Sequence, residues 1–233
     1  GWPVRAGVPE TGAQLIAIDA DGDRLLDVCW AGGNSAGADS TALFFENNGE
    51  TKFALATREA IGTSTTLSAA DFDNDGDVDI YVCGYSAPTG GANAPVPYHD
   101  ANNGHRNRLL RNEGEFRFTD VTDEVGLDVD NTRYTLSACC GDFDIDGDMD
   151  LYVANDFGRN CLYENDGAGR FRDVAPQLGV EDQATGMSVS WSDYNNDGWM
   201  DLYVANMWSS AGNRITDKAA FRADADESKR AAY

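Results

Sequence analysis

Short apolar runs recur along the chain, and each follows a run in which acidic residues alternate with other residues. The runs Ile80–Cys83, Leu151–Val153 and Leu202–Val204 are rich in β-branched and aromatic side chains, which is typical of β-strands. Further short apolar segments, such as Leu15–Ile18 and Thr65–Ala70, lie just before the acidic runs. The pattern therefore predicts pairs of strands joined by acidic loops.

A second pair of predicted strands follows each of these pairs. Residues 42–45 and 52–55 flank Glu46-Asn-Asn-Gly-Glu50, which has the Asn-Gly chemistry of a β-hairpin turn. The same order returns at residues 107–121 and 160–174. Each unit is therefore expected to contain a strand, an acidic loop, a strand, a connection, a strand, a glycine turn and a strand.

This unit repeats along the chain. Its acidic loops begin at Asp19, Asp71, Asp142 and Asp193, which are 52, 71 and 51 residues apart. Four short antiparallel strands in a repeat of about fifty residues describe a β-propeller blade, whereas a β-sandwich would not repeat its sequence in this way. We expect an all-β chain that forms part of a single β-propeller. It would contain three complete four-stranded blades and part of a fourth, at about residues 13–62, 63–127, 128–180 and 181–215.

The acidic loops have the residue pattern of a calcium site. Carboxylates at positions 1, 3, 5 and 9 converge on one point, position 7 offers its carbonyl oxygen, and hard oxygen ligands in this number suit Ca²⁺. We expect up to four Ca²⁺ ions. The predicted ligands are Asp19, Asp21, Asp23, Leu25 and Asp27; Asp71, Asp73, Asp75, Asp77 and Asp79; Asp142, Asp144, Asp146, Asp148 and Asp150; and Asp193, Asn195, Asp197, Trp199 and Asp201.

Two other interpretations of these loops are less consistent with the sequence. A solvated acidic turn would not recur at regular spacing. An EF-hand needs a glutamate at position 12 and a following helix, but Val82, Val153 and Val204 occupy that position and begin no helical pattern. The first loop has Arg24 where glycine is expected and the fourth has Asn195 in place of aspartate, so we expect the second and third loops to bind most tightly.

The composition indicates where the protein is located and excludes some classes of partner. Forty acidic and 17 basic residues give a formal net charge of −23, which is too acidic for a nucleic-acid-binding protein. No apolar run approaches the roughly 18 residues of a membrane span, and a chain that starts at Gly1 without Met fits a processed protein. Low-affinity calcium loops suit a location outside the cytoplasm. There we expect at most two disulfides among the five cysteines, with at least one thiol left over.

Two segments depart from the repeat. Residues 84–106 form an insertion that carries both histidines, His99 and His105, and a ligand or transition-metal site there is the alternative to the favoured interpretation, an ordered loop. Residues 216–233 are rich in alanine and charge, which predicts a helical insertion or tail. Residues 1–14 contain Gly and Pro and are expected to form an initial loop.

The repeated loops and strands resemble the FG-GAP/VCBS class of calcium-binding propeller repeats, the kind found in integrin α subunits. Residues 202–206 and 209–216 more narrowly resemble the ASPIC/UnbV, cartilage-acidic-protein-like group. This resemblance implies a propeller of about seven blades, so further copies or segments would complete it. It also implies a secreted, extracellular or cell-surface protein, with a periplasmic location as another option.

Two functions follow from these observations. The first is a non-catalytic calcium-binding module for adhesion, binding or structural assembly, whose partner is a protein or glycan at an extracellular surface. The alternative is a carbohydrate-active or other enzyme with its site on the loop face. The sequence contains neither Gly-x-Ser-x-Gly nor His-Glu-x-x-His, and cation binding accounts for the carboxylate clusters, so the first is favoured.

Overall fold

The computed structural model describes residues 11–33, 40–50, 52–62, 64–85, 95 and 100–207, and it confirms the all-β prediction. Strands pair with their sequence neighbours, all antiparallel, in three four-stranded sheets and one two-stranded sheet. The first two sheets contain β1 (Thr11–Ile18), β2 (Asp27–Gly33), β3 (Ser40–Asn47) and β4 (Phe53–Gly62), then β5 (Ser64–Ala70), β6 (Asp79–Gly84), β7 (Arg108–Asn112) and β8 (Phe118–Asp120). The others contain β9 (Thr135–Gly141), β10 (Asp150–Asn155), β11 (Cys161–Asn165) and β12 (Phe171–Asp173), then β13 (Gly186–Ser192) and β14 (Asp201–Asn206).

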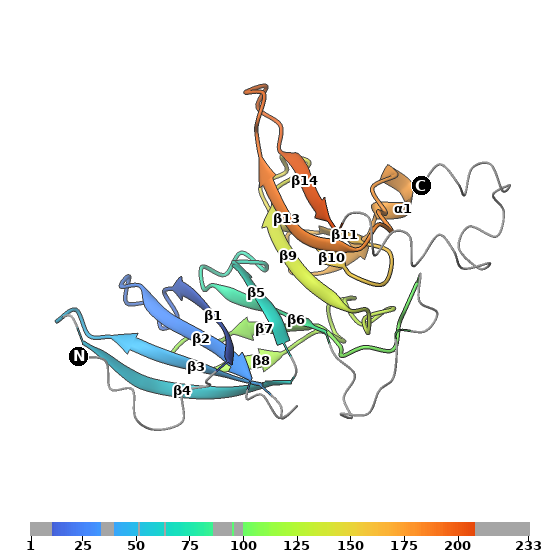
Figure 1. The fold of residues 1–233 in the computed structure, drawn as a ribbon. Helices are drawn as coiled ribbons and strands as arrows, with labels where there is room; N and C mark the ends of the chain where they lie inside the picture. The colour runs from blue at the N-terminus through green and yellow to red at the C-terminus, as the bar shows by residue number, and fades with distance from the viewer. Residues whose placement is uncertain are drawn as a thin grey trace, which may run out of the picture.

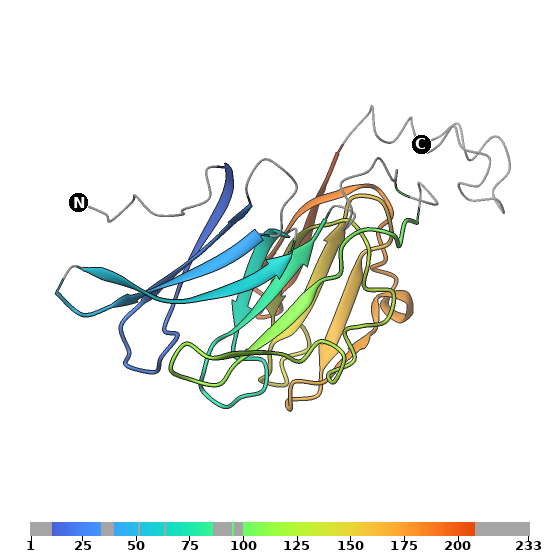
Figure 2. The same cartoon turned by 90° about the horizontal axis from the view of Figure 1, so that it is seen from below.

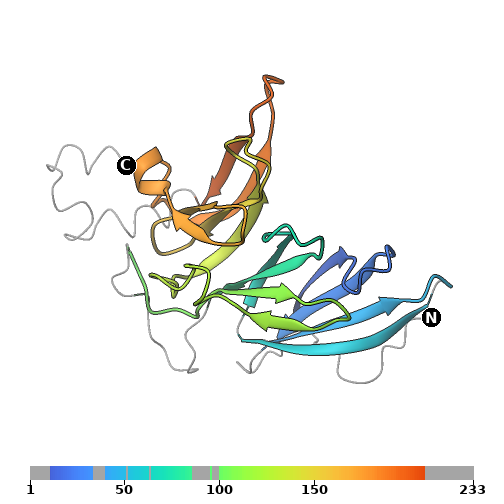
Figure 3. The ribbon, with the colours of Figure 1, turned by 180° about the vertical axis from the view of Figure 1, so that it is seen from behind.

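The four sheets follow one another around an arc, as successive blades of a propeller do (Figures 1 and 3). The first strands of successive sheets, β1, β5, β9 and β13, contact one another in turn along the inner side of the arc. Figure 2 shows the same sheets from below. The arc is open between the β1–β4 sheet and the β13–β14 pair.

Alternate side chains of the second strand pack against the blades on its two sides. In β6, Ile80 and Val82 pack into the core shared with the first sheet, whereas Tyr81 and Cys83 pack into the core shared with the third. Every residue of β6 and of β10 is buried. Successive side chains of a strand point to opposite faces, so an apolar run without polar alternation is what a strand buried on both faces requires.

One local expectation differs from the structure, and two further features go beyond the sequence pattern. Strand β1 starts at Thr11, within the predicted initial loop, and the Gln14 side chain donates a hydrogen bond to the Leu67 carbonyl of β5 in the next sheet. Residues 59–62 are the end of the long strand β4. A short helix, α1 (Ala175–Leu178), follows β12 and ends at Gly179, whose φ of 71° provides the left-handed C-cap.

The remaining expectations concern cysteines and chain segments. All five cysteines are described, and none of them forms a disulfide in the structure. Cys139 and Cys140 are adjacent in β9 and face different cores, as their positions predict. The predicted helix at 216–233 lies outside the described residues. Within the described part of the chain, no helix is long and apolar enough to cross a membrane.

Candidate metal centres

Each acidic loop joins the first and second strands of its sheet and gathers carboxylates. One ligand atom from each of three carboxylates lies within 4.8 Å of the others in the first three loops. These triads are Asp19, Asp21 and Asp27; Asp71, Asp73 and Asp79; and Asp142, Asp144 and Asp146. The structure therefore brings 9 of the predicted ligands together, and calcium ligation by them remains a prediction.

The position-1 carboxylate organises the backbone of each loop. In the second loop, Asp71 accepts the N–H groups of Asp75 and Gly76 at 3.2 and 2.9 Å. The third and fourth loops repeat this pattern at 2.9–3.1 Å. In the first loop the equivalent Asp19 accepts from Gly22 and Arg24 at 2.9 and 2.8 Å. These hydrogen bonds fold the loop around its first carboxylate in all four copies.

Two positions of every loop, 4 and 6, have a left-handed backbone. Glycine occupies position 6 in the last three loops, with φ of 91–100°, and Arg24 adopts φ of 71° there in the first loop. Position 4 has φ of 60–63° in the last three loops and 82° at Gly22. The first loop thus has its glycine at position 4 instead of position 6, so Arg24 alters the sequence pattern without altering the fold of the loop.

The position-9 aspartates of the first three loops are buried, and each links its own loop to the third strand of its sheet. Asp79, 1% exposed, accepts from the Phe72 N–H inside its own loop at 3.1 Å and from the Asn112 N–H at the end of β7 at 2.8 Å. Asp27 and Asp150 make the same two bonds at 2.8–3.0 Å. Among the described residues, Asp201 makes only the bond inside its loop, at 3.1 Å, because that sheet contains two strands.

Two of the asparagines that bind the position-9 aspartates, Asn112 and Asn165, also connect neighbouring blades, a role that our sequence reasoning missed. The Asn165 side chain donates to the Met149 carbonyl of its own loop at 3.0 Å and to the Phe72 carbonyl of the preceding loop at 2.7 Å. Asn112 likewise donates to Ala20 of the preceding loop, at 3.3 Å. The sequence signal for this role is the Asn-x-Gly that recurs at residues 47, 112 and 165, which by itself predicts only a turn.

The electrostatics of the loops favour a cation. Burial, helped by the charges of the other carboxylates in each loop, raises the pKa of Asp79 to about 7 and that of Asp150 to about 6. Burial and the neighbouring Asp146 also raise the pKa of Asp148 to about 6. Carboxylates that repel one another in this way are stabilised in their charged form by a bound cation.

The donor set fits Ca²⁺. Only oxygen atoms converge, and one of them, Asp73 Oδ1, is buried without a hydrogen-bond donor among the described residues. In the fourth loop the Asn195 amide donates to Asp197 at 3.0 Å, so fewer charged oxygens face the centre. The order of calcium affinity among the loops stays a prediction.

The structure describes one of the two histidines of the insertion. His105 is buried, and its ring occupies the space beside Gly62, where a Cβ atom would lie 2.4 Å from His105 Cε1. His99 lies outside the described residues. The insertion instead contributes Asp100, which pairs with Arg133 and, at 3.2 Å, with Arg159.

Comparisons with known proteins agree with this geometry. The FG-GAP-like repeat family matches residues 19–82 and 142–204, and each match contains two of the acidic loops. Cartilage acidic protein 1 of Xenopus tropicalis and of Mus musculus are each 26% identical to this chain over 206 residues, covering 82% of this chain and 30% of the relative. The chain thus spans about 30% of the length of these curated relatives. Since the family matches cover more than half of the chain, the protein belongs to the FG-GAP-like repeat family.

Proposed function

We propose that the chain is a calcium-stabilised, non-catalytic binding module of an extracellular protein. The observation that carries this proposal is the repeated carboxylate triad, whose ligand atoms lie within 4.8 Å of one another in three successive loops. Ca²⁺ bound there would neutralise the triad and hold the first and second strands of each blade together. Affinity in the range of extracellular calcium modules would keep these loops filled where Ca²⁺ is millimolar.

Calcium would also support the contacts between blades. The first two loops offer their position-2 carbonyls to the asparagine of the next blade, as in Asn165 to Phe72 at 2.7 Å. The position-2 side chains of these two loops are buried, and the Phe72 ring contacts the Phe171 ring of the next blade at a centroid distance of 5.6 Å. An ion that fixes the loop therefore fixes the surface on which the next blade packs.

An extracellular location and a binding role agree with the relatives. They are named for cartilage and for acidity, and this chain shares the acidity, with 40 acidic and 17 basic residues. FG-GAP-like repeats suit a scaffold that presents loops to a protein or glycan. The carboxylate triads of the described residues fall in the acidic loops, where cation binding accounts for them, and this favours binding over an enzyme.

The face of β13–β14 that points away from the third sheet is proposed to take a further blade of the same kind. Tyr203 on this face is 69% exposed, whereas Tyr81 and Tyr152, at the same position of the second and third sheets, are fully buried against the next blade. Tyr194, at position 2 of its loop, is 78% exposed where Phe72 is fully buried. The occupant would continue an interface that already occurs between successive sheets.

Calcium stoichiometry tests the proposed function. Native mass spectrometry of the full chain in Ca²⁺ should show up to four bound ions. The double variant Asp71→Asn/Asp73→Asn should lose one ion, because it removes two ligands of one triad. The matched variant Asp123→Asn/Asp128→Asn changes two exposed acids outside the loops and should lose none. A chain that binds no Ca²⁺, or equal losses in both variants, would refute the proposal.

A further inference from the structure

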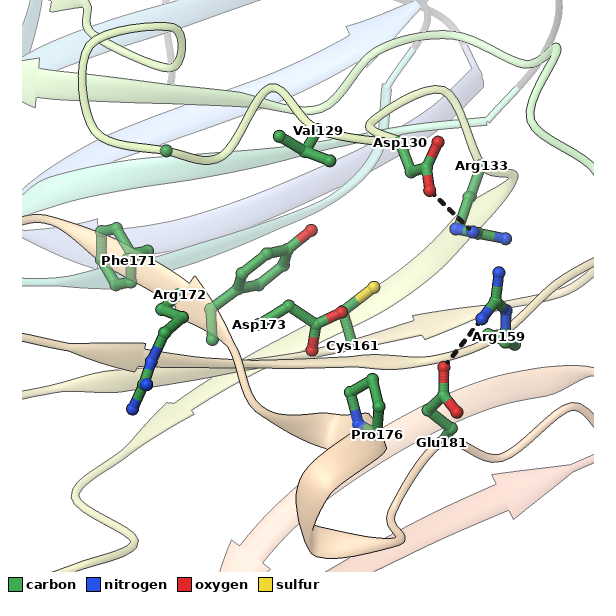
Figure 4. A pocket seen from close by; sticks show the side chains of 12 residues that line it. Val129, Asp130, Arg133, Arg159, Cys161, Phe171, Arg172, Asp173, Pro176 and Glu181 are labelled. Atoms are coloured by element: carbon green, nitrogen blue, oxygen red, sulfur yellow. Dashed lines mark hydrogen bonds and ion pairs between the residues drawn. The ribbon is translucent and has the colours of Figure 1, made fainter.

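A cavity of about 510 Å³ lies where the segment between β8 and β9 packs against the third sheet, and none of the cation-loop residues lines it. Its wall combines the segment 126–133 with side chains of β11, β12 and α1 (Figure 4). The close packing of this segment on β12 needs Gly126, since a Cβ atom there would lie 2.6 Å from the Phe171 carbonyl oxygen. This volume is typical of small-molecule sites.

The cavity has an apolar part and a polar end. Figure 4 shows Phe171 and Val129 on one side, while the guanidinium groups of Arg133 and Arg159 face each other at the other end. Val129 is 72% exposed and forms the rim, whereas Phe171 is buried. A ligand that enters would therefore meet carbon surface on one side and hydrogen-bonding groups on the other.

The two arginines are held in place by carboxylates. Asp100 bridges them, and Arg159 also pairs with Glu181 at 3.1 Å. Burial acts against the charge of Asp100, but hydrogen bonds and the charges of both arginines together lower its pKa. These ion pairs fix the arginines before any ligand binds, which reduces the entropic cost of recognition.

Arg133 retains hydrogen-bonding capacity. Its side chain is 7% exposed, and its Nε has no acceptor among the described residues. Its contact with Asp130 is long, at 3.7 Å, and the Asp130 side chain is 61% exposed, so it can give way. A ligand oxygen that displaces Asp130 would take over its contact with Arg133 Nη2, on the same guanidinium whose Nε is buried without an acceptor among the described residues.

The charge of the wall indicates a neutral ligand. Three arginines and three acids line the cavity, namely Arg133, Arg159, Arg172, Asp130, Asp173 and Glu181. Their charges cancel, so a free anion would meet the acids and a free cation the arginines. Hydroxyl groups donate to carboxylates and accept from guanidinium groups, and the C–H face of a sugar ring can pack on apolar walls. We propose that this cavity binds a neutral pyranose sugar.

Saturation-transfer NMR on the calcium-loaded full chain tests this proposal. The probes are the methyl glycosides of glucose, galactose, mannose and N-acetylglucosamine, together with maltotriose and chitotriose, and glucuronate and glucosamine serve as charged comparisons. At least one neutral probe should receive saturation, and the charged probes should receive less. Stronger binding of a trisaccharide than of its methyl glycoside would indicate an oligosaccharide chain, whereas equal binding would indicate a single sugar.

Two variants test whether the sugar binds in this cavity. Val129→Trp fills the rim from an exposed position and should reduce affinity at least tenfold, and Arg159→Gln should reduce it through the loss of a donor while leaving Val129 in place. Leu55→Trp adds the same ring at an exposed position of β4 outside the cavity and should change nothing. The proposal is overturned if no neutral probe binds, if charged probes bind better, or if binding survives both cavity variants.

Discussion

At the scale of single residues, the glycine at position 6 is required by its backbone conformation. Gly76 has φ of 98°, and a Cβ atom there would meet nothing within 4 Å. Gly76→Ala should therefore destabilise the calcium-free protein by about 1–2 kcal/mol through backbone strain alone. Chemical denaturation in chelator measures this loss.

A comparison variant distinguishes backbone strain at Gly76 from a general sensitivity of the loops to substitution. Ile145 is β-branched, 52% exposed and has φ of 63° at position 4, where two other loops have asparagine. Ile145→Asn should leave stability unchanged or raise it, because asparagine tolerates this conformation better. Equal destabilisation by both variants would show that strain is not the reason for the glycine.

At the scale of elements, the asparagine that ends the third strand links neighbouring blades. Asn165→Asp keeps the shape of the side chain but removes the donor to Phe72 and Met149 and adds a buried charge. We expect a loss of at least about 2 kcal/mol, since buried acceptors are left without donors. Differential scanning calorimetry would record it as a lower melting temperature.

The same substitution in the first blade is the control. Asn47 is only half-buried and its amide donates to a single described carbonyl, that of Leu26, at 3.1 Å. Asn47→Asp should therefore cost clearly less than Asn165→Asp. If the two variants lose the same stability, the hydrogen bond between blades contributes little.

The parts of the structure that could be predicted from the sequence are those whose signal lies in neighbouring residues. The strands and loops follow from alternation and from the spacing of aspartates, and the all-β prediction is confirmed. The role of Asn112 and Asn165 involves partners 92 and 93 residues away, which no local pattern reveals. The sugar cavity is similarly non-local, because Arg133 and Arg159 meet only through Asp100 of the insertion.

At the scale of the whole molecule, the exposed face of the fourth sheet differs from the equivalent covered faces. Tyr152 is fully buried and Tyr203, its counterpart, is 69% exposed. Tyr152→Ser should cost about 3 kcal/mol or more, as large-to-small core substitutions do, and Tyr203→Ser should stay within about 0.5 kcal/mol. Similar losses in urea denaturation would show that the β13–β14 face is already covered in this chain.

The pH dependence of stability should differ with and without Ca²⁺. Because burial raises the pKa of Asp79 to about 7 from a usual value of 3.8, its protonated form stabilises the calcium-free fold. That contribution is complete below the usual value and is lost as the pH rises through 7. Asp150, with a pKa of about 6, acts in the same direction. In chelator the melting temperature should fall as the pH rises from 5 to 7, and saturating Ca²⁺ should remove this fall; a chelated protein that gains stability over that range would contradict the shifts.

The most direct test of the account is the melting temperature of the full chain at neutral pH in chelator, in millimolar Mg²⁺ and in millimolar Ca²⁺. Ca²⁺ bound to the folded state alone stabilises it by mass action, by about 2.7 kcal/mol for each site at a hundredfold excess over Kd. Mg²⁺, which demands a smaller octahedral site, should do less. The account predicts a melting temperature that rises with Ca²⁺ concentration, and by less in Asp73→Asn. The same melting temperature in chelator and in Ca²⁺ would contradict it.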